Sequence, residues 1–209
     1  MKGHLKMKKY FAVVLFLSCV FIYAQETSFK SVCTKLAEHP NMTGNFTQVK
    51  TIKKVNRSLT SSGTFIFSLD GIMWNTQKPF PSVLAVGMTS VIQTMPDGKQ
   101  NIIDASSNRI FRSISGTLSS MFSGNAESLY SDFNIEFSSS GKTWNAVLTP
   151  KDSTVAAVLS SIAVSGESLS EVDKIIMTES GGDTITYNFT DKKYPKELTA
   201  DEKAYFIAK

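Results

Sequence analysis

The chain has little of the chemistry that metal sites and nucleophilic enzymes need. It contains two cysteines and two histidines, and beyond residue 24 only Cys33 and His39 remain. One cysteine excludes an internal disulfide, and these two donors are too few for a zinc site built from nitrogen and sulfur ligands. The sequence also lacks a Gly-x-Ser-x-Gly elbow and a glycine-rich phosphate loop. We therefore expect no cofactor, no metal and no enzymatic activity.

An excess of charge of one sign is also missing once the first residues are set apart. Residues 1–24 hold four lysines and no acid, so the net charge of +4 falls to zero in the remainder, with 18 basic and 18 acidic residues. Nucleic-acid binding depends on clustered cations that neutralise phosphates. The composition therefore argues against a nucleic-acid partner.

Long apolar runs are absent except at residues 10–24. This run follows the four lysines and is too short to span a bilayer comfortably, which is typical of a secretory signal peptide. We expect cleavage after Ala24, which makes residues 1–24 a signal peptide and residues 25–209 a single secreted domain. An alternative is a lipid anchor on Cys19, which ends a loose lipobox.

Amphipathic spacing predicts a helix between residues 27 and 40. The apolar residues that share one face of it are Phe29, Val32, Cys33 and Leu36. Their spacing of i, i+3, i+4 and i+7 is that of one side of a helix. Cys33 is then expected to be a small buried hydrophobe, and His39 a surface residue beside the negative helix end.

From Asn45 onward the chain turns to short segments rich in Val, Ile, Thr, Phe and Trp, separated by turn residues. The expected strands are 46–55, 59–69, 72–77, 82–86, 90–95, 99–105, 133–138, 143–149, 161–164, 172–179 and 184–189. Their short connections require antiparallel pairing. The sequence therefore predicts a β-meander that forms most of the domain.

Two further sets of apolar residues recur at helical spacing. One set is Ile114, Leu118, Met121 and Phe122, and the other is Val155, Val158, Leu159 and Ile162. The first predicts a short helix over the sheet, and the second a short helix or turn that leads into the strand at 161–164. The fold class is therefore α+β.

Several strands carry more apolar residues than simple alternation needs. They are Phe65, Phe67, Ile72, Met73, Trp74, Val83, Leu84 and Val86, together with Met88, Met95 and Met121. A curved sheet uses such residues to line a cavity, and flexible methionines adapt to acyl chains of different shapes. The alternative is a well-filled core, which composition by itself favours.

Four motifs follow one another in a specific order. A segment with Phe-Thr-Gln at 44–50 precedes a glycine-containing segment at 59–65, a tryptophan-bearing segment at 71–74 and Lys-Pro-Phe at 78–80. With the helix before them, these motifs resemble the LolA-like outer-membrane lipoprotein carrier family. The resemblance implies an incomplete antiparallel β-barrel (a curved sheet) that is closed by short helices around a hydrophobic cavity.

The resemblance also implies a function and partners. It implies a monomeric periplasmic carrier that shields the acyl chains of lipoproteins or glycolipids between inner-membrane donor and outer-membrane acceptor proteins. One feature departs from the family, because Leu69-Asp70-Gly71 stands where the typical carrier has an Arg-Pro pair whose arginine latches the lid. Arg57, Arg109 and Arg112 are candidate replacements.

We expect acyl chains to bind on the concave face of the sheet. The expected lining residues are Phe65, Phe67, Trp74, Val86 and Met121. The expected lid residues, from the two helices, are Phe29, Val32, Leu36, Leu118 and Phe122. A one-residue slip in strand register would turn the strand residues outward.

Two other functions remain open at this point. One is a static β-rich envelope or adhesion module with a filled core and no ligand. The other is an enzyme that uses a carboxylate pair, for which the candidates are Asp70, Asp97, Asp104, Glu136 and Glu179.

Overall fold

The fold is one large antiparallel sheet with a few short helices. The computed structural model describes residues 27–87, 89–104 and 109–207. The strands are β1 (Met42–Ile52), β2 (Arg57–Ser68), β3 (Gly71–Lys78), β4 (Ser82–Gly87), β5 (Ser90–Thr94), β6 (Gln100–Asp104), β7 (Phe133–Ser140), β8 (Thr143–Pro150), β9 (Leu159–Gly166), β10 (Lys174–Glu179) and β11 (Thr184–Lys193). The helices are α1 (Phe29–Leu36), α2 (Arg109–Phe122), α3 (Ala126–Asp132), α4 (Ser153–Ala156) and α5 (Ala200–Lys203), with 3-10 turns η1 (Lys53–Val55) and η3 (Ala204–Phe206).

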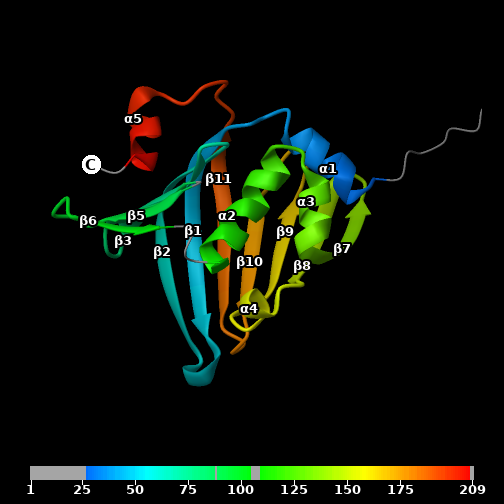
Figure 1. Cartoon of the computed structure of the whole chain (residues 1–209), viewed down its shortest axis with the longest axis horizontal. Helices are drawn as coiled ribbons and strands as arrows, with labels where there is room; N and C mark the ends of the chain where they lie inside the picture. The colour runs from blue at the N-terminus through cyan, green and yellow to red at the C-terminus, as the bar shows by residue number, and fades with distance from the viewer. Residues whose placement is uncertain (1–26, 88, 105–108, 208–209) are drawn as a thin grey trace, which may run out of the picture.

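The strand order explains why helices cover one face of the sheet. The order is β6-β5-β4-β3-β2-β1-β11-β10-β9-β8-β7, so two meanders meet where β1 pairs with β11. The edge strands β6 and β7 lie at opposite ends, and the chain between them passes through α2 and α3. These helices therefore cross the concave face, with α1 beside them (Figure 1). The sheet is curved and open, as the family resemblance implies.

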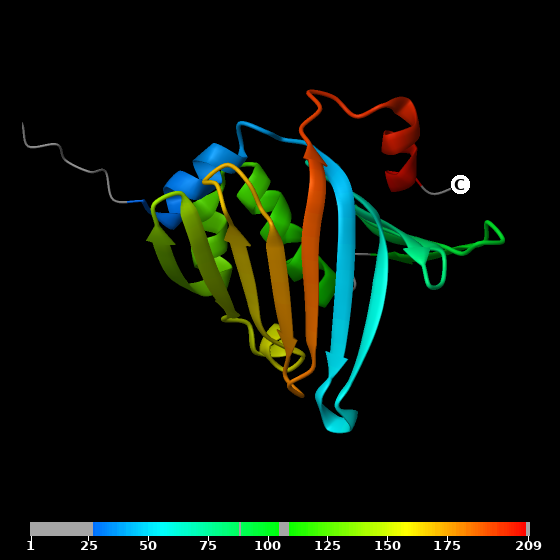
Figure 2. The same ribbon diagram turned by 180° about the vertical axis from the view of Figure 1, so that it is seen from behind.

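The sheet between β2 and β5 buries apolar residues on both faces. Phe65 and Phe67 belong to the main core under the helices, whereas Ile66, between them, faces the other side. There Ile66 packs with Met73 on β3 and with Leu198 of the C-terminal segment. That segment, which continues into α5 and η3, lies apart from the other helices (Figure 2). The second buried face explains the excess of apolar residues in these strands.

Several sequence-based boundaries differ from the structure. The helical pattern that starts at Val155 is wrong beyond Ala156, because Leu159 and Ile162 lie on β9, where pairing with β8 and β10 holds an extended backbone. Val158 is exposed, so no continuous helical face forms. α3 and α5 were not predicted, since helices of seven and four residues carry too few repeats to show a period.

Other expectations fall outside the described residues. These are the signal peptide at 1–24, the anchor at Cys19, Met88 and the last residue of the expected strand 99–105.

Within the described part of the chain, none of the helices has both the length and the apolar character that a membrane crossing requires.

Gly63 lies where β2 packs closely on β3. The β2–β3 register shifts between Ser62 and Gly63, and a Cβ atom on Gly63 would lie 1.9 Å from the carbonyl oxygen of Asn75. Only a residue without a side chain fits this approach without moving the backbone.

We expect Gly63→Ala to lower the free energy of unfolding by about 1–3 kcal/mol or more, because the added methyl group forces the two strands apart. Urea denaturation measures this change. Gly116→Ala on α2 is the matched control, because no described atom other than those of its chain neighbours and its own helix backbone lies within 4 Å of its Cβ position. The control should stabilise the protein by up to about 1 kcal/mol. Equal unfolding midpoints for the wild type and Gly63→Ala would contradict the steric argument.

Candidate functional site

An aromatic cluster lies on the concave face at the centre of the sheet. Its members are Phe46 on β1, Phe65 and Phe67 on β2, Trp74 on β3, and Tyr187 and Phe189 on β11. Strand register brings them together, because Phe46 stands opposite Phe189 and Phe65 stands opposite Trp74. Residues opposite each other in an antiparallel pair share a face. The cluster therefore depends on the pairing of β1 with β11 as much as on the β2–β3 hairpin.

The rings contact one another closely. The ring centroids of Phe65 and Phe189 are 4.7 Å apart, and those of Phe67 and Phe189 are 5.1 Å apart with an interplanar angle of 77°. Trp74 meets Phe67 edge-on at 6.1 Å. Such offset and edge-to-face pairs are favourable beyond the area that they bury. The cluster forms a continuous apolar floor beneath the helices.

Helix α2 covers this floor through apolar side chains. Leu118, Met121 and Phe122 are buried in the same core, and the Phe122 ring lies 5.7 Å from that of Phe67. These side chains offer no hydrogen-bonding group except the weakly accepting methionine sulfur. Apolar contact is non-directional, so the contact between these residues and the floor does not depend on one fixed geometry.

The structure brings the sequence-predicted site residues together. Eight of them belong to one buried cluster, which includes Phe29, Val32, Leu36, Phe65, Phe67, Leu118, Met121 and Phe122. Trp74 packs against that cluster, and Val86 packs with Val91 in a small neighbouring cluster that Trp74 also touches. The expected lining residue Met121 lies on α2 beside the lid residues Leu118 and Phe122, whereas Phe65, Phe67, Trp74 and Val86 lie on strands.

Sequence reasoning missed Phe46, Tyr187 and Phe189. Phe46 stands inside the Phe-Thr-Gln motif, which was the available signal for it. The two β11 residues join the site through a pairing between strands about 140 residues apart in the chain, and their sequence neighbourhood gives no sign of that partner.

The expected cavity is filled in this structure. Phe65 and Phe67 are each 1% exposed and Met121 is 0% exposed, so the side chains of the floor and of α2 occupy the space between them. Trp74, Leu84 and Tyr187 are half-buried. Among the grooves that described residues line, one includes Phe65 together with Ile66, Met73 and Tyr205, and three others include no member of the aromatic cluster. Binding of an acyl chain here therefore requires these apolar side chains to move.

The floor contains one unsatisfied donor. Trp74 Nε1 is buried and has no hydrogen-bond partner among the described residues, although its ring lies 5.7 Å from that of Tyr187. Burial raises the pKa of Tyr187 to about 12, so its hydroxyl stays neutral at physiological pH. A buried N–H without an acceptor is unfavourable, and a ligand oxygen at this place would satisfy it.

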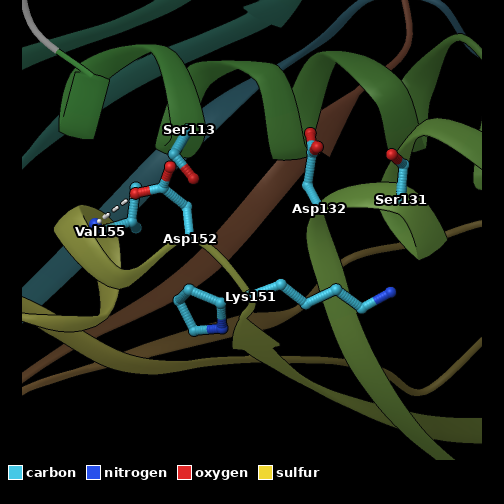
Figure 3. A pocket seen from close by; sticks show the side chains of 7 residues that line it. Ser113, Ser131, Asp132, Lys151, Asp152 and Val155 are labelled. Atoms are coloured by element: carbon cyan, nitrogen blue, oxygen red, sulfur yellow. Dashed lines mark hydrogen bonds between the residues drawn. The ribbon is translucent and has the colours of Figure 1, made fainter.

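A polar groove of about 560 Å³ lies at the end of the helical layer (Figure 3). Its polar groups support local structure. Asp152 Oδ1 accepts hydrogen bonds from the backbone N–H groups of Thr154 (2.8 Å) and Val155 (3.1 Å) at the start of α4. Lys151 Nζ points away from Asp152 and donates to the carbonyl of Tyr130 at 2.6 Å. These roles hold α3 and α4 against β8.

The expected carboxylates and arginines are dispersed. Among the acids, Asp70 and Asp97 lie in different turns, Asp104 ends β6, Glu136 lies on β7, and Glu179 pairs with Lys50 at 3.0 Å. No three or more His, Cys, Asp or Glu residues gather as metal ligands within the described chain. Arg57 begins β2 at an exposed hairpin tip. Arg109 and Arg112 are part of α2, and their side chains lie outside the described part of the structure.

Comparison with known proteins points to one family. Residues 38–202 match the family model described as outer membrane lipoprotein carrier protein LolA. The chain matches none of the curated proteins. A LolA superfamily protein from Nitrosomonas europaea is 11% identical over 84% of this chain and 96% of that chain, with a TM-score of 0.45. A DUF1329 family protein from Desulfovibrio piger is 10% identical over 86% and 95%, with a TM-score of 0.44.

Cys33 tests how tightly α1 packs on the site. Its side chain is 0% exposed, and burial raises the pKa of the thiol from 9.0 to about 12. We expect the folded protein to resist a thiol reagent at pH 8 and to react fully in denaturant, because the thiolate is the reactive form. Rapid labelling of the folded protein would contradict this packing.

The raised pKa of Cys33 also makes the stability of the protein depend on pH at alkaline values. The folded state favours the neutral thiol of Cys33. Its contribution to the free energy of unfolding is therefore fully present below pH 9 and is lost as the pH rises towards 12. Tyr187 and Tyr194, whose pKa values burial also raises to about 12, act in the same direction. The alkaline loss of stability should therefore be smaller in Cys33→Ala than in the wild type.

Proposed function

Because residues 38–202 match its model, the chain belongs to the LolA family, and we propose that it is a periplasmic carrier of acyl chains. The cargo is a lipoprotein or a related amphiphile, which the protein transfers towards the outer membrane. The family is one of carriers rather than enzymes. The observation that carries the proposal is the aromatic floor of the sheet, covered by α2 through Leu118, Met121 and Phe122.

An acyl chain would enter by replacing these helix side chains on the floor. Each methylene that leaves water for this site contributes about 0.8 kcal/mol, which offsets the lost contacts between helix and sheet. The empty protein and the loaded protein both bury apolar surface through non-directional contacts. Leu118, Met121 and Phe122 can therefore leave the floor without breaking a side-chain hydrogen bond. Met121 suits this exchange because its unbranched side chain adopts several shapes.

In the described part of the chain, the ion pair that links α1 to its neighbouring helix is weak. Lys30 on α1 pairs with Glu127 on α3 at 2.6 Å, but both side chains are about two-thirds exposed. Exposed pairs contribute little to stability. With Leu69-Asp70-Gly71 in place of the Arg-Pro pair, we propose that closure of this lid depends mainly on apolar contact.

The proposed setting rests on the family and on the signal peptide that the sequence predicts. We propose that the mature protein begins after Ala24, works as a monomer in the periplasm, and exchanges cargo with an inner-membrane donor and an outer-membrane acceptor. The acyl chain lies on the concave face, and the polar part of the cargo remains in water.

A second candidate function is a static envelope module. The observation that favours it is the filled core, in which the predicted lining residues are packed against one another. Such a module takes up no lipid and needs no movement of α2.

Native mass spectrometry of protein purified from its producing cells distinguishes the two functions. A carrier should retain a bound amphiphile, and organic extraction followed by lipid analysis then identifies the cargo class. Protein that is reproducibly empty and also takes up no fluorescent acyl probe would overturn the carrier proposal and favour the static module.

The two tryptophans report where an acyl chain binds. In Trp144→Phe the remaining tryptophan is Trp74 on the floor, and we expect a brominated fatty acid to quench its emission. In Trp74→Phe the remaining tryptophan is Trp144, which is 3% exposed and donates from Nε1 to the carbonyl of Ser168 at 2.9 Å. This matched variant should be quenched much less. Equal quenching in both variants would place the acyl chain elsewhere.

A further inference from the structure

We propose that the tip of the β1–β2 hairpin, residues 50–59, docks the protein on an anionic membrane surface. β1 and β2 run past the helical layer, and their connection is a projecting end of the molecule (Figures 1 and 2). The connection consists of η1 and Asn56, whose left-handed backbone (φ 48°) turns the chain into β2. This contact surface is separate from the acyl site, and membrane docking does not require bound cargo.

Two large apolar side chains are exposed at the tip. Val55 is 55% exposed and Leu59 is 61% exposed. Leu59 also has the strand parity of Phe65 and Phe67, so it lies on the concave face of the sheet. An apolar residue at the tip is thus aligned with the floor of the acyl site along one strand.

The same tip is strongly basic. Its cations are Lys50, Lys53, Lys54 and Arg57, and the sequence has no Asp or Glu between Glu38 and Asp70. Acidic groups reach the tip from the neighbouring β10–β11 hairpin. Glu179 pairs with Lys50 at 3.0 Å, and Asp183 accepts a hydrogen bond from the backbone N–H of Lys53 at 3.0 Å.

Lys54 and Arg57 therefore provide the charge that faces outward. Both are exposed, and no carboxylate within the described residues forms an ion pair with either of them. Residues 25–209 together carry no net charge, so this positive charge is a local feature of the tip. Cations beside exposed apolar side chains are the combination that binds anionic lipid headgroups and inserts shallowly into the interface.

A bilayer fits the tip better than an acidic protein does. An acidic protein would complement the charge, but Val55 and Leu59 stand on a narrow projection, and neither residue lines the four grooves found among the described residues. A bilayer accepts such side chains without a matching cavity. Docking at this end would also present the strand that leads from Leu59 to the floor directly to the membrane.

Vesicle flotation tests the proposal with the cargo-free mature protein. Vesicles of equal parts phosphatidylglycerol and phosphatidylcholine should bind the wild type at low salt, whereas pure phosphatidylcholine vesicles should not. Lys54→Glu with Arg57→Glu should reduce the partition coefficient roughly tenfold or more. Val55→Ser with Leu59→Ser should also weaken binding and leave a residual component that high salt removes.

Matched variants control for net charge and for exposed apolar area. Lys142→Glu with Lys196→Glu makes the same charge change at exposed lysines outside the tip. Met95→Ser with Ile102→Ser removes two side chains that are 46% and 48% exposed on the β5–β6 hairpin. Both controls should bind vesicles like the wild type. Circular dichroism melting curves should show that every variant is folded.

A labelled cysteine adds a direct readout of insertion, since Cys33 is buried. Val55→Cys carrying an environment-sensitive dye should shift to shorter wavelength on anionic vesicles, and Met95→Cys should not. Absence of wild-type flotation, or equal losses in tip and control variants, would overturn the proposal. A tip that is needed only for binding an isolated acidic protein would also overturn it. Uptake of an acyl probe by the tip variants separates this result from failure of the carrier function.

Discussion

The pairing of β1 with β11 is the constraint on which the rest of the structure depends. It joins two meanders that are far apart in the sequence and leaves β6 and β7 as distant edges. The chain between those edges must then cross a face of the sheet, and it does so as α2 and α3. The same pairing places Phe46 opposite Phe189 and completes the aromatic floor. One backbone ladder thus builds both the site and its cover.

The character of the cover follows from the side chains that it uses. Leu118, Met121 and Phe122 meet the floor through apolar contact, which depends on buried area and hardly on angle. A polar latch would hold the cover in one closed position through hydrogen bonds that must break on opening. An apolar cover can instead be replaced on the floor by an acyl chain, which makes contacts of the same kind. This difference makes the filled core of the structure compatible with the proposed carrier function.

The two faces of the sheet are closed in different ways. The concave face is covered by helices inserted between its edges, and the convex face near β2–β5 is covered by Leu198, Tyr205 and Phe206 from the end of the chain. Without that segment, the side chains of Ile66 and Met73 would be exposed to water. The C-terminal segment therefore completes the folded unit, and the tip of the β1–β2 hairpin is left as a projecting apolar and basic surface.

The local sequence pattern determined the positions of several helices and most strands. Helical spacing located α1 and the end of α2, and turn residues separated most strands to within a few positions, because both signals depend on near neighbours. Alternation also placed Phe65, Phe67 and Trp74 on one face. Tertiary structure decided the remainder. The partner of β1, the contribution of Tyr187 and Phe189, and the extension of β9 into the expected helix at Leu159 all depend on contacts between distant segments, which no local period records. Likewise, the sequence indicated which residues would line the concave face, and only packing in three dimensions decided that their side chains fill it.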